Sequence, residues 1–275
     1  MFRENLHLKY IFIILLGFFF SFHSNAVFAK KKIRKVVIDA GHGGKDPGCH
    51  GLYSNEKDIT LSVAKKLGKM IQEKYKDVKV VYTRESDVLA GGDYLSIKES
   101  LVYRTELANK EKGDLFISIH VNSTPRKNSP VKGTLVLVCG PTRVEEKVVA
   151  ISGHTDNIAE NEELLSPMDP ATQIIVAQYS QAFLAQSIVV ASKISDGFTN
   201  QGRVSEGIRQ QSLQVLASSA MPGVLVEIGY LNNVEEENYL NTDDGQNEVA
   251  ASIFNGIRFY KEESEKETIQ VIKDN

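Results

Sequence analysis

The sequence predicts one α/β domain in which helices cover both faces of a mostly parallel or mixed central sheet. Short apolar segments rich in β-branched residues alternate with longer segments whose apolar positions follow helical spacing. No Gly/Ser-rich or Pro-rich linker and no internal repeat divides the 275 residues. A hydrophobic share of 42% is enough for one sizeable core. We therefore expect a single domain.

Five segments are predicted to be strands. The third is the clearest, because all residues from Leu115 to Ile119 are large and apolar except one serine, and His120 follows them. The first ends in the turn Gly41-His42-Gly43-Gly44. Near-continuous apolar runs of this length are typical of strands buried on both faces. The predicted strands are 35–39, 78–83, 115–120, 133–139 and 224–228.

Four longer segments are predicted to be helices. The first is capped by Ser54 or Asn55, and its apolar stripe recurs every three or four residues. The charged tail that begins at Lys261 is expected to fray. The stripe comprises Ile59, Val63, Leu67 and Ile71, and the other helices cover about 95–110, 171–193 and a C-terminal segment marked by Val249, Ile253 and Ile257.

The N-terminal segment has the features of a signal peptide. Arg3 and Lys9 precede an apolar run over residues 10–20, and Ala26 or Ala29 offers a small residue for cleavage. The run is about half as long as a spanning helix requires, although an uncleaved anchor stays an alternative. We predict a signal peptide over residues 1–29, export to the periplasm or cell envelope, and no stable membrane span after cleavage.

The net charge indicates which partners are expected, and the two cysteines raise the question of a disulfide. The formal net charge is −3 for the whole chain and remains negative after residues 1–29 are removed. A nucleic-acid binder needs a basic surface, so nucleic acid is not expected as a partner. Cys49 and Cys139 could form a disulfide in an oxidising compartment, or could be buried free thiols. The sequence leaves both alternatives open.

Chemically competent side chains are expected at one edge of the sheet. His42 follows the first strand, His120 ends the third, and Glu227 follows Val224-Leu225-Val226 in the last. Glu56 begins the helix after the first strand, so it also belongs to the carboxyl edge, where α/β folds place their sites. Two imidazoles, one carboxylate and a position for water are typical of catalytic zinc. A second carboxylate would act as general base.

Each of these residues also has an ordinary structural interpretation. Glu56 could only favour the dipole of its helix. Glu227 could pair with Arg209 instead of acting on a substrate. The sequence Gly41 to Lys45 lacks Walker A spacing, and residues 212–219 contain serines without a nucleophile elbow. Phosphate binding and serine hydrolysis are therefore not supported.

Four blocks of sequence together resemble a known family. They begin at Val37 and continue with Glu56-Lys57-Asp58, Ser118-Ile119-His120-Val121-Asn122 and 225–233. The first block is Val37-Ile38-Asp39-Ala40-Gly41-His42-Gly43-Gly44-Lys45-Asp46-Pro47-Gly48, and the last is Leu225-Val226-Glu227-Ile228-Gly229-Tyr230-Leu231-Asn232-Asn233. In this order the blocks are similar to the type-3 N-acetylmuramoyl-L-alanine amidases, and the resemblance extends over about residues 35–260.

The resemblance implies an activity and assigns residues to it. It implies one Zn²⁺ per chain held by His42, Glu56 and His120, with Glu227 as the catalytic carboxylate. It implies peptidoglycan as substrate and cleavage between muramic acid and L-alanine, for cell separation and wall remodelling. Asn122 and Arg209 are the predicted substrate-binding or supporting residues, and Asn122 would bind substrate or fix the loop after His120. The catalytic domain would cover 30–262, with a charged tail over 263–275.

The resemblance also implies regulation. The segment 143–169 is similar to the regulatory helix of division-associated members, in which an acidic side chain blocks zinc until an activator displaces the helix. Glu160 and then Glu162 are the candidates for that side chain. The simpler alternative is a solvated acidic helix with no contact to the metal. Arg84 and Arg104 resemble recurring family arginines and are expected to be structural.

Two rival functions remain. The first is a zinc peptidase that cuts another amide of the cell wall. The second is a non-catalytic wall-binding protein on a degenerate amidase scaffold, which should have lost a ligand or the base. Because His42, Glu56, His120 and Glu227 are all present, the non-catalytic alternative is not favoured, and analysis of the digestion products separates the amidase from the peptidase.

Overall fold

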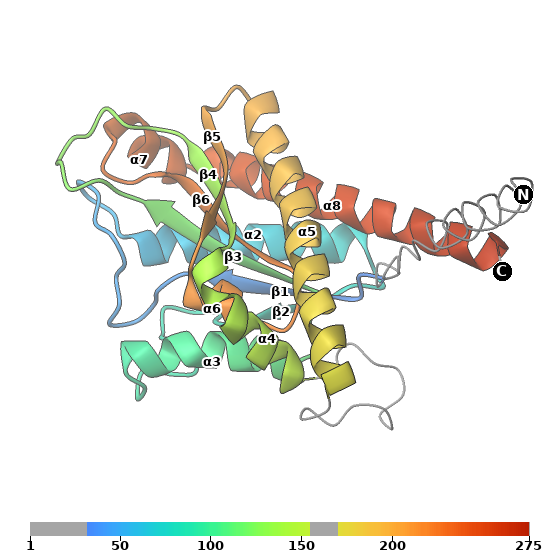
Figure 1. Ribbon diagram of the computed structural model, residues 1–275. Helices are drawn as coiled ribbons and strands as arrows, with labels where there is room; N and C mark the ends of the chain where they lie inside the picture. Colours follow the sequence, from blue (N-terminus) through green and yellow to red (C-terminus); the bar gives the residue numbers. More distant parts are fainter. Residues whose placement is uncertain (1–31, 155–169, 275) are drawn as a thin grey trace, which may run out of the picture.

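The computed structural model describes residues 32–154 and 170–274, with side chains as far as residue 266. The described chain forms a six-stranded mixed sheet with strand order β2-β1-β3-β6-β4-β5 (Figure 1). The predicted α/β domain with helices around a mixed sheet is confirmed. The strands are β1 (Lys35–Ala40), β2 (Lys79–Tyr82), β3 (Leu115–Asn122), β4 (Thr134–Cys139), β5 (Ser205–Gln211) and β6 (Gly223–Tyr230).

Strand direction places four carboxyl ends at one edge of the sheet. β2, β1, β3 and β6 are mutually parallel, whereas β4 is antiparallel to β6 and β5 is parallel to β4. β5 is absent from the sequence prediction. Its sequence, SEGIRQQ, is largely polar, and as an edge strand it is half-buried or exposed along its length. It therefore lacks the apolar run that revealed the other strands.

Helices cover both faces of this sheet. One face packs against α2 (Glu56–Lys74), α5 (Pro170–Asn200) and α8 (Asp243–Asp274), which share the larger hydrophobic core with alternate residues of β1, β3 and β6. The opposite face packs against α3 (Ile97–Lys110) and α6 (Gln214–Ala217). A seven-residue helix, α7 (Val234–Leu240), directly follows β6 and lies near its carboxyl end (Figure 1).

The C-terminal helix does not fray where the sequence prediction placed its frayed end. α8 continues to Asp274, and Lys261 and Ser264 are buried within it. The ammonium of Lys261 donates to Ile33 O at 3.3 Å and contacts the carboxylates of Asp77 and Glu265. The charges that predicted a solvated tail instead tie this helix to the start of β1.

The described part of the segment 143–169 contains a helix that packs on the core. After a short 3-10 turn at Pro141–Arg143, residues Val144–Ser152 form α4. Lys147 and Ile151 of α4 are buried, and the Lys147 ammonium donates to Leu216 O, Met221 O and Ser219 Oγ. α4 is thus anchored to the core. Glu160 and Glu162 lie outside the described residues.

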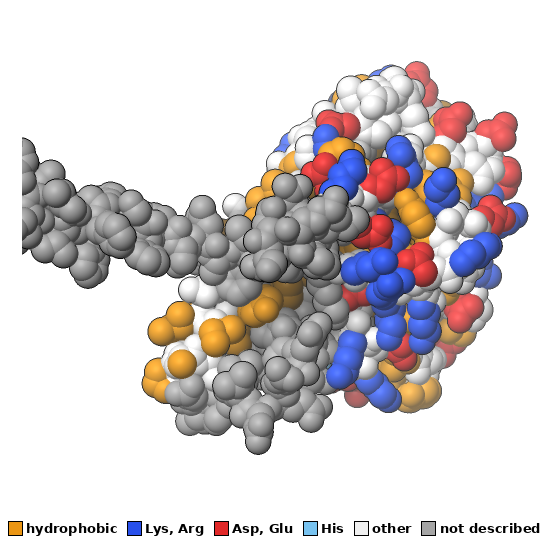
Figure 2. All heavy atoms as spheres, turned by 90° about the vertical axis from the view of Figure 1, so that its right-hand side faces the viewer, with side chains coloured by type: hydrophobic (Ala, Val, Ile, Leu, Met, Phe, Trp, Pro, Cys, Tyr) orange, Lys and Arg blue, Asp and Glu red, His pale blue; other side chains and the backbone are white. Residues whose placement is uncertain are grey.

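Some of the exposed large apolar side chains lie on α4 and α5. By length and composition, α5 is the one helix among the described residues that could cross a membrane. In this fold it packs against α8, α4 and β4. Figure 2 shows exposed hydrophobic side chains at its lower left and intermixed basic and acidic side chains over the right half. The large exposed hydrophobics of α4 and α5 are Val144, Val149, Ile174 and Ile188.

The two cysteines are free thiols, which decides between the alternatives that the sequence left open. Both are half-buried. The Cys49 thiol lies 3.2 Å from the carbonyl oxygen of Val121. Burial raises the pKa of Cys49 well above its usual range, so this thiol stays protonated at neutral pH.

Candidate metal centre and active site

Three of the predicted site residues meet at the carboxyl edge of β1 and β3. His42 follows β1, His120 lies in β3, and Glu56 is the first residue of α2. One candidate ligand atom from each lies within 4.8 Å of the others. His42 Nε2 is 3.2 Å from Glu56 Oε2, and His120 Nδ1 is 2.9 Å from Glu56 Oε1. These side chains could hold a metal ion.

The backbone holds the Glu56 carboxylate between the two rings. Cys49 N donates to Oε2 at 2.8 Å and Val121 N donates to Oε1 at 2.9 Å. Burial acts to raise the pKa of Glu56, but hydrogen bonds with His120 and His42 outweigh burial and hold this pKa well below its usual range. The carboxylate is therefore ionised, as a metal ligand must be.

Two glycines make room for the ligands. A Cβ at Gly41 would lie 2.5 Å from the His120 ring, and a Cβ at Gly48 would lie 2.5 Å from Glu56 Oε2. Gly48 also has φ +69°. Between them His42 itself has φ 63°, a left-handed conformation that is uncommon outside glycine. The sequence thus provides the space and the turn that bring three donors together.

Asp46 orients the imidazole of His42. Its Oδ2 lies 2.8 Å from His42 Nδ1, leaving Nε2 directed at Glu56. Burial acts to lower the pKa of His42, yet the contacts with Glu56 and Asp46 raise it on balance. Histidine ligands commonly use their second ring nitrogen in this way. Asp46 is not among the site residues predicted from the sequence, although its position four residues after His42 was a usable signal.

Removing the Asp46 carboxylate should weaken metal binding. We expect Asp46→Ala to lower zinc affinity by about 10- to 100-fold, because the His42 ring loses the partner that fixes its orientation. Competition with a chromophoric chelator measures this. Asp58→Ala removes an exposed carboxylate two residues from Glu56 and should change affinity less than about two-fold. Equal affinities for Asp46→Ala and the native protein would exclude the orienting role.

Two arginines brace the loop that carries His42. Arg84 donates to the carbonyl oxygens of Ala40 and Gly41, and Arg104 donates to those of Ala40 and His42. Arg104 also forms a 2.5 Å ion pair with the fully buried Asp39. This geometry agrees with the structural role expected for both arginines.

Glu227 lies beside the three candidate ligands. It is the register partner of His120 across β3 and β6, so the two side chains project from the same face of the sheet. Its Oε2 is buried without a hydrogen-bond partner among the described residues. Burial raises the pKa of Glu227 to about 7; His120 and His42 lower it while Glu56 raises it. A carboxyl with such a pKa is poised to exchange protons near neutral pH.

The supporting residues differ in how the structure places them. Arg209 pairs with Glu206 at 2.7 Å and not with Glu227, so the alternative ion pair considered for Glu227 is wrong. Asn122 Oδ1 accepts a hydrogen bond from Ser123 N at 2.8 Å, a contact that stabilises the turn after β3. Substrate contacts of Asn122 and Arg209 stay predictions.

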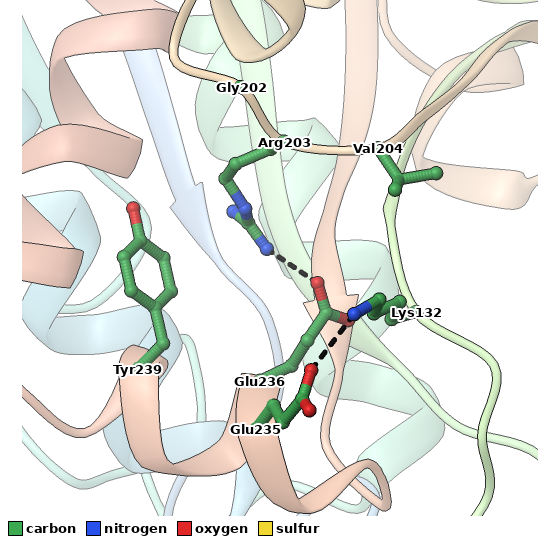
Figure 3. A pocket seen from close by; sticks show the side chains of 7 residues that line it. All are labelled: Lys132, Gly202, Arg203, Val204, Glu235, Glu236 and Tyr239. Carbon is green, nitrogen blue, oxygen red and sulfur yellow. Dashed lines mark hydrogen bonds and ion pairs between the residues drawn. The ribbon is translucent and has the colours of Figure 1, made fainter.

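A pocket of about 230 Å³ lies beside α7 (Figure 3). Arg203 reaches across it to Glu236 at 2.8 Å, and Lys132 pairs with Glu235 at 2.9 Å. Glu236 Oε2 also accepts hydrogen bonds from Tyr230 N and Gly133 N. The charged side chains of the pocket therefore pair with one another and tie α7 to the end of β6 and to the segments that precede β4 and β5.

The fold and this donor set define a class: an α/β domain with a candidate metal centre at the carboxyl edge of its parallel strands. The chain belongs to the N-acetylmuramoyl-L-alanine amidase family, whose model matches residues 36–258. The match includes His42, Glu56, His120 and Glu227.

Curated relatives support the same family. The chain is 31% identical to the N-acetylmuramoyl-L-alanine amidase AmiC of Escherichia coli over 234 residues, which are 82% of this chain and 52% of the relative. It is 31% identical to the probable amidase AmiB of Haemophilus influenzae, over 95% of this chain and 59% of that protein. The chain thus spans little more than half the length of these relatives.

Solved structures share the fold. The catalytic domain of the amidase CwlV from Paenibacillus polymyxa matches with a TM-score of 0.54 and 28% identity, covering 83% of this chain and 98% of that one. An N-acetylmuramoyl-L-alanine amidase from Clostridium difficile matches with a TM-score of 0.55 and 27% identity, covering 84% and 97%.

Proposed function

We propose that this protein hydrolyses the amide bond between N-acetylmuramic acid and L-alanine in peptidoglycan, with one zinc ion held by His42, Glu56 and His120. One observation carries the proposal. In a chain of the amidase family, two imidazoles and an ionised carboxylate converge beside a second carboxyl group that has a buried, unpaired oxygen.

The donor set fits zinc. Two histidine nitrogens and one carboxylate oxygen are the protein ligands of many catalytic zinc sites, and these sites keep a position open. Glu56 is ionised, and Asp46 binds Nδ1 of His42, which leaves Nε2 directed at the site. A bound zinc ion would polarise the scissile carbonyl and lower the pKa of a water molecule.

The chain's own residues would move the proton. The Glu227 carboxylate accepts a proton from the attacking water. The water oxygen then forms a bond to the lactyl carbonyl carbon, and the bond between this carbon and the amide nitrogen breaks. Glu227 then donates the proton to the departing amine of L-alanine. The pKa of about 7 suits both steps, because protonated and ionised forms are both accessible near neutral pH.

Metal removal tests this proposal. Dialysis against a strong chelator should abolish release of peptides from purified cell walls, and one equivalent of zinc should restore it. The expected loss is at least about 100-fold, because the site loses the charge that stabilises the transition state. Full activity of a preparation with no detectable metal would exclude a zinc-dependent mechanism.

The proposal requires export and leaves room for regulation. Peptidoglycan lies outside the cytoplasmic membrane, so we propose residues 1–29 as the signal peptide.

We also propose Glu160 or Glu162 as the inhibitory side chain that an activator displaces. Since α4 is anchored by Lys147, the deletion that tests this should begin after residue 154. An unchanged rate of wall digestion by a protein lacking 155–169 would exclude inhibition.

A further inference from the structure

A carboxylate of α7 binds the loop that precedes Glu56. Glu237 is fully buried, and its two oxygens accept hydrogen bonds from Leu52 N at 2.8 Å, Tyr53 N at 2.9 Å and Ser54 N at 3.0 Å. The Ser54 hydroxyl donates a fourth at 2.7 Å. One side chain thus satisfies three consecutive backbone N–H groups, 183 to 185 residues away in the sequence.

This loop leads directly to the candidate metal ligand. Gly51 N donates to Ser54 O at 2.9 Å, and Glu56 N donates to Cys49 O at 3.0 Å. Cys49 N in turn donates to the Glu56 carboxylate. The conformation of residues 49–54 therefore determines where α2 begins. It also determines the position of Cys49 N, one of the two N–H groups that bind the Glu56 carboxylate.

The contact is close and charge-assisted. A Cβ at Gly51 would collide with Glu237 Oε1 and with the carbonyl oxygen of Leu231, so the loop approaches α7 as closely as glycine permits. Burial acts to raise the pKa of Glu237, but hydrogen bonds from Tyr53, Leu52 and Ser54 lower it on balance. Hydrogen bonds to an ionised carboxylate are about twice as strong as neutral ones.

We propose that Glu237 is a positioning residue of the metal centre: its carboxylate fixes the loop 51–54 and thereby presents Glu56 to His42 and His120. The inference deepens the proposed function and rests on the metal site that this function requires. Neutralising Glu237 leaves all three ligands in the chain but releases the loop that aligns one of them.

Neighbouring acids of α7 provide a matched control. Glu236 does not contact this loop: it pairs with Arg203 (Figure 3) and accepts a hydrogen bond from Tyr230 N at the end of β6. Glu235 is exposed and pairs with Lys132 at the surface. Glu235→Gln therefore makes the same chemical change in the same helical turn without touching the loop.

Zinc affinity of the metal-free full chain tests the proposal by chelator competition, independently of activity. We expect Glu237→Gln to bind zinc about tenfold more weakly than the native protein and Glu235→Gln to change less than about two-fold. Faster amide exchange at Leu52 and Tyr53 in Glu237→Gln should accompany the loss. Native zinc affinity in a folded Glu237→Gln protein, even with a lowered melting temperature, would overturn the inference and indicate a merely structural role.

A milder variant covers the case in which Glu237→Gln does not fold. Ser54→Ala removes one of the four hydrogen bonds and should weaken zinc binding about three-fold. Unchanged zinc affinity of this variant would then overturn the proposal.

Failure of the proposed function gives a different result. A native protein that binds zinc but does not digest cell walls would contradict the amidase proposal and leave the role of Glu237 intact. A native protein that binds no zinc overturns both.

Discussion

Replacing Glu227 with glutamine is expected to lower kcat for wall digestion by about 10²- to 10⁴-fold while leaving the zinc content unchanged. Glutamine keeps the volume of the side chain but cannot accept and return a proton. Glu227 lies beside His120 without being one of the three clustered ligands, so the metal should remain bound. Steady-state kinetics and metal analysis of the same preparation measure the two quantities together.

Glu206→Gln is the matched control for this experiment. Glu206 lies on β5, where it accepts a hydrogen bond from the Tyr230 hydroxyl at 2.6 Å and pairs with Arg209. Its substitution should change kcat less than about three-fold. A Glu227→Gln protein with kcat within a factor of about ten of the native value would contradict the catalytic assignment.

The same residue predicts the pH dependence. Proton abstraction needs the carboxylate form, and burial raises the pKa of Glu227 to about 7. Activity should therefore fall on the acidic side, at or below about pH 7, since protonated Glu227 cannot act as a base. A bound dication would shift this limb to lower pH by favouring the carboxylate. A pH–rate profile of kcat/KM checks it, and a limb that persists unchanged in Glu227→Gln would assign it to another group.

Removing Asp39 is expected to lower the free energy of unfolding by about 3–5 kcal/mol. The Asp39 carboxylate is fully buried and accepts hydrogen bonds from Arg104, Thr83 Oγ1 and Ser118 Oγ. Asp39→Ala would leave the Arg104 guanidinium buried without its counter-charge. Because domains of this kind are stable by about 5–15 kcal/mol, this single change would remove a large part of the total.

Urea unfolding at neutral pH measures the effect of Asp39→Ala. Asp196→Ala serves as control, because Asp196 is exposed and forms a surface ion pair with Lys193. Its loss should cost at most about 1 kcal/mol. If Asp39→Ala lowers the free energy of unfolding no more than Asp196→Ala does, the buried pair of Asp39 and Arg104 does not provide the expected stabilisation.

The sequence predicted those parts of the fold that have a local signal. β1, β3 and β6 contain apolar runs that are followed by polar residues, and this pattern was enough to predict His42, His120 and Glu227 at one edge. It was not enough for β5, whose residues are polar because it lies at the edge of the sheet. The extent of α8 was missed because Lys261 is charged, although its ammonium is satisfied by a distant carbonyl and two carboxylates.

The supporting groups of the site depend on contacts that no local pattern reveals. Asp39 meets Arg104 across 65 positions, and Glu237 meets Leu52 across 185. An acidic residue at the start of a helix is ordinary, so Glu237 carried no sign of its place beside the loop of Glu56. The alternative ion pair of Glu227 with Arg209 was wrong for a different reason: Arg209 pairs with Glu206, a carboxylate three residues away in its own strand.

Product analysis after digestion of purified peptidoglycan tests the central claim most directly. An amidase of the proposed specificity releases intact stem peptides with a free L-alanine amino group and leaves glycan strands that carry free lactyl carboxyl groups. Mass spectrometry of the soluble and insoluble fractions distinguishes these products. Stem-peptide fragments that remain attached to muramic acid, with new ends inside the peptide, would contradict the account and indicate a peptidase.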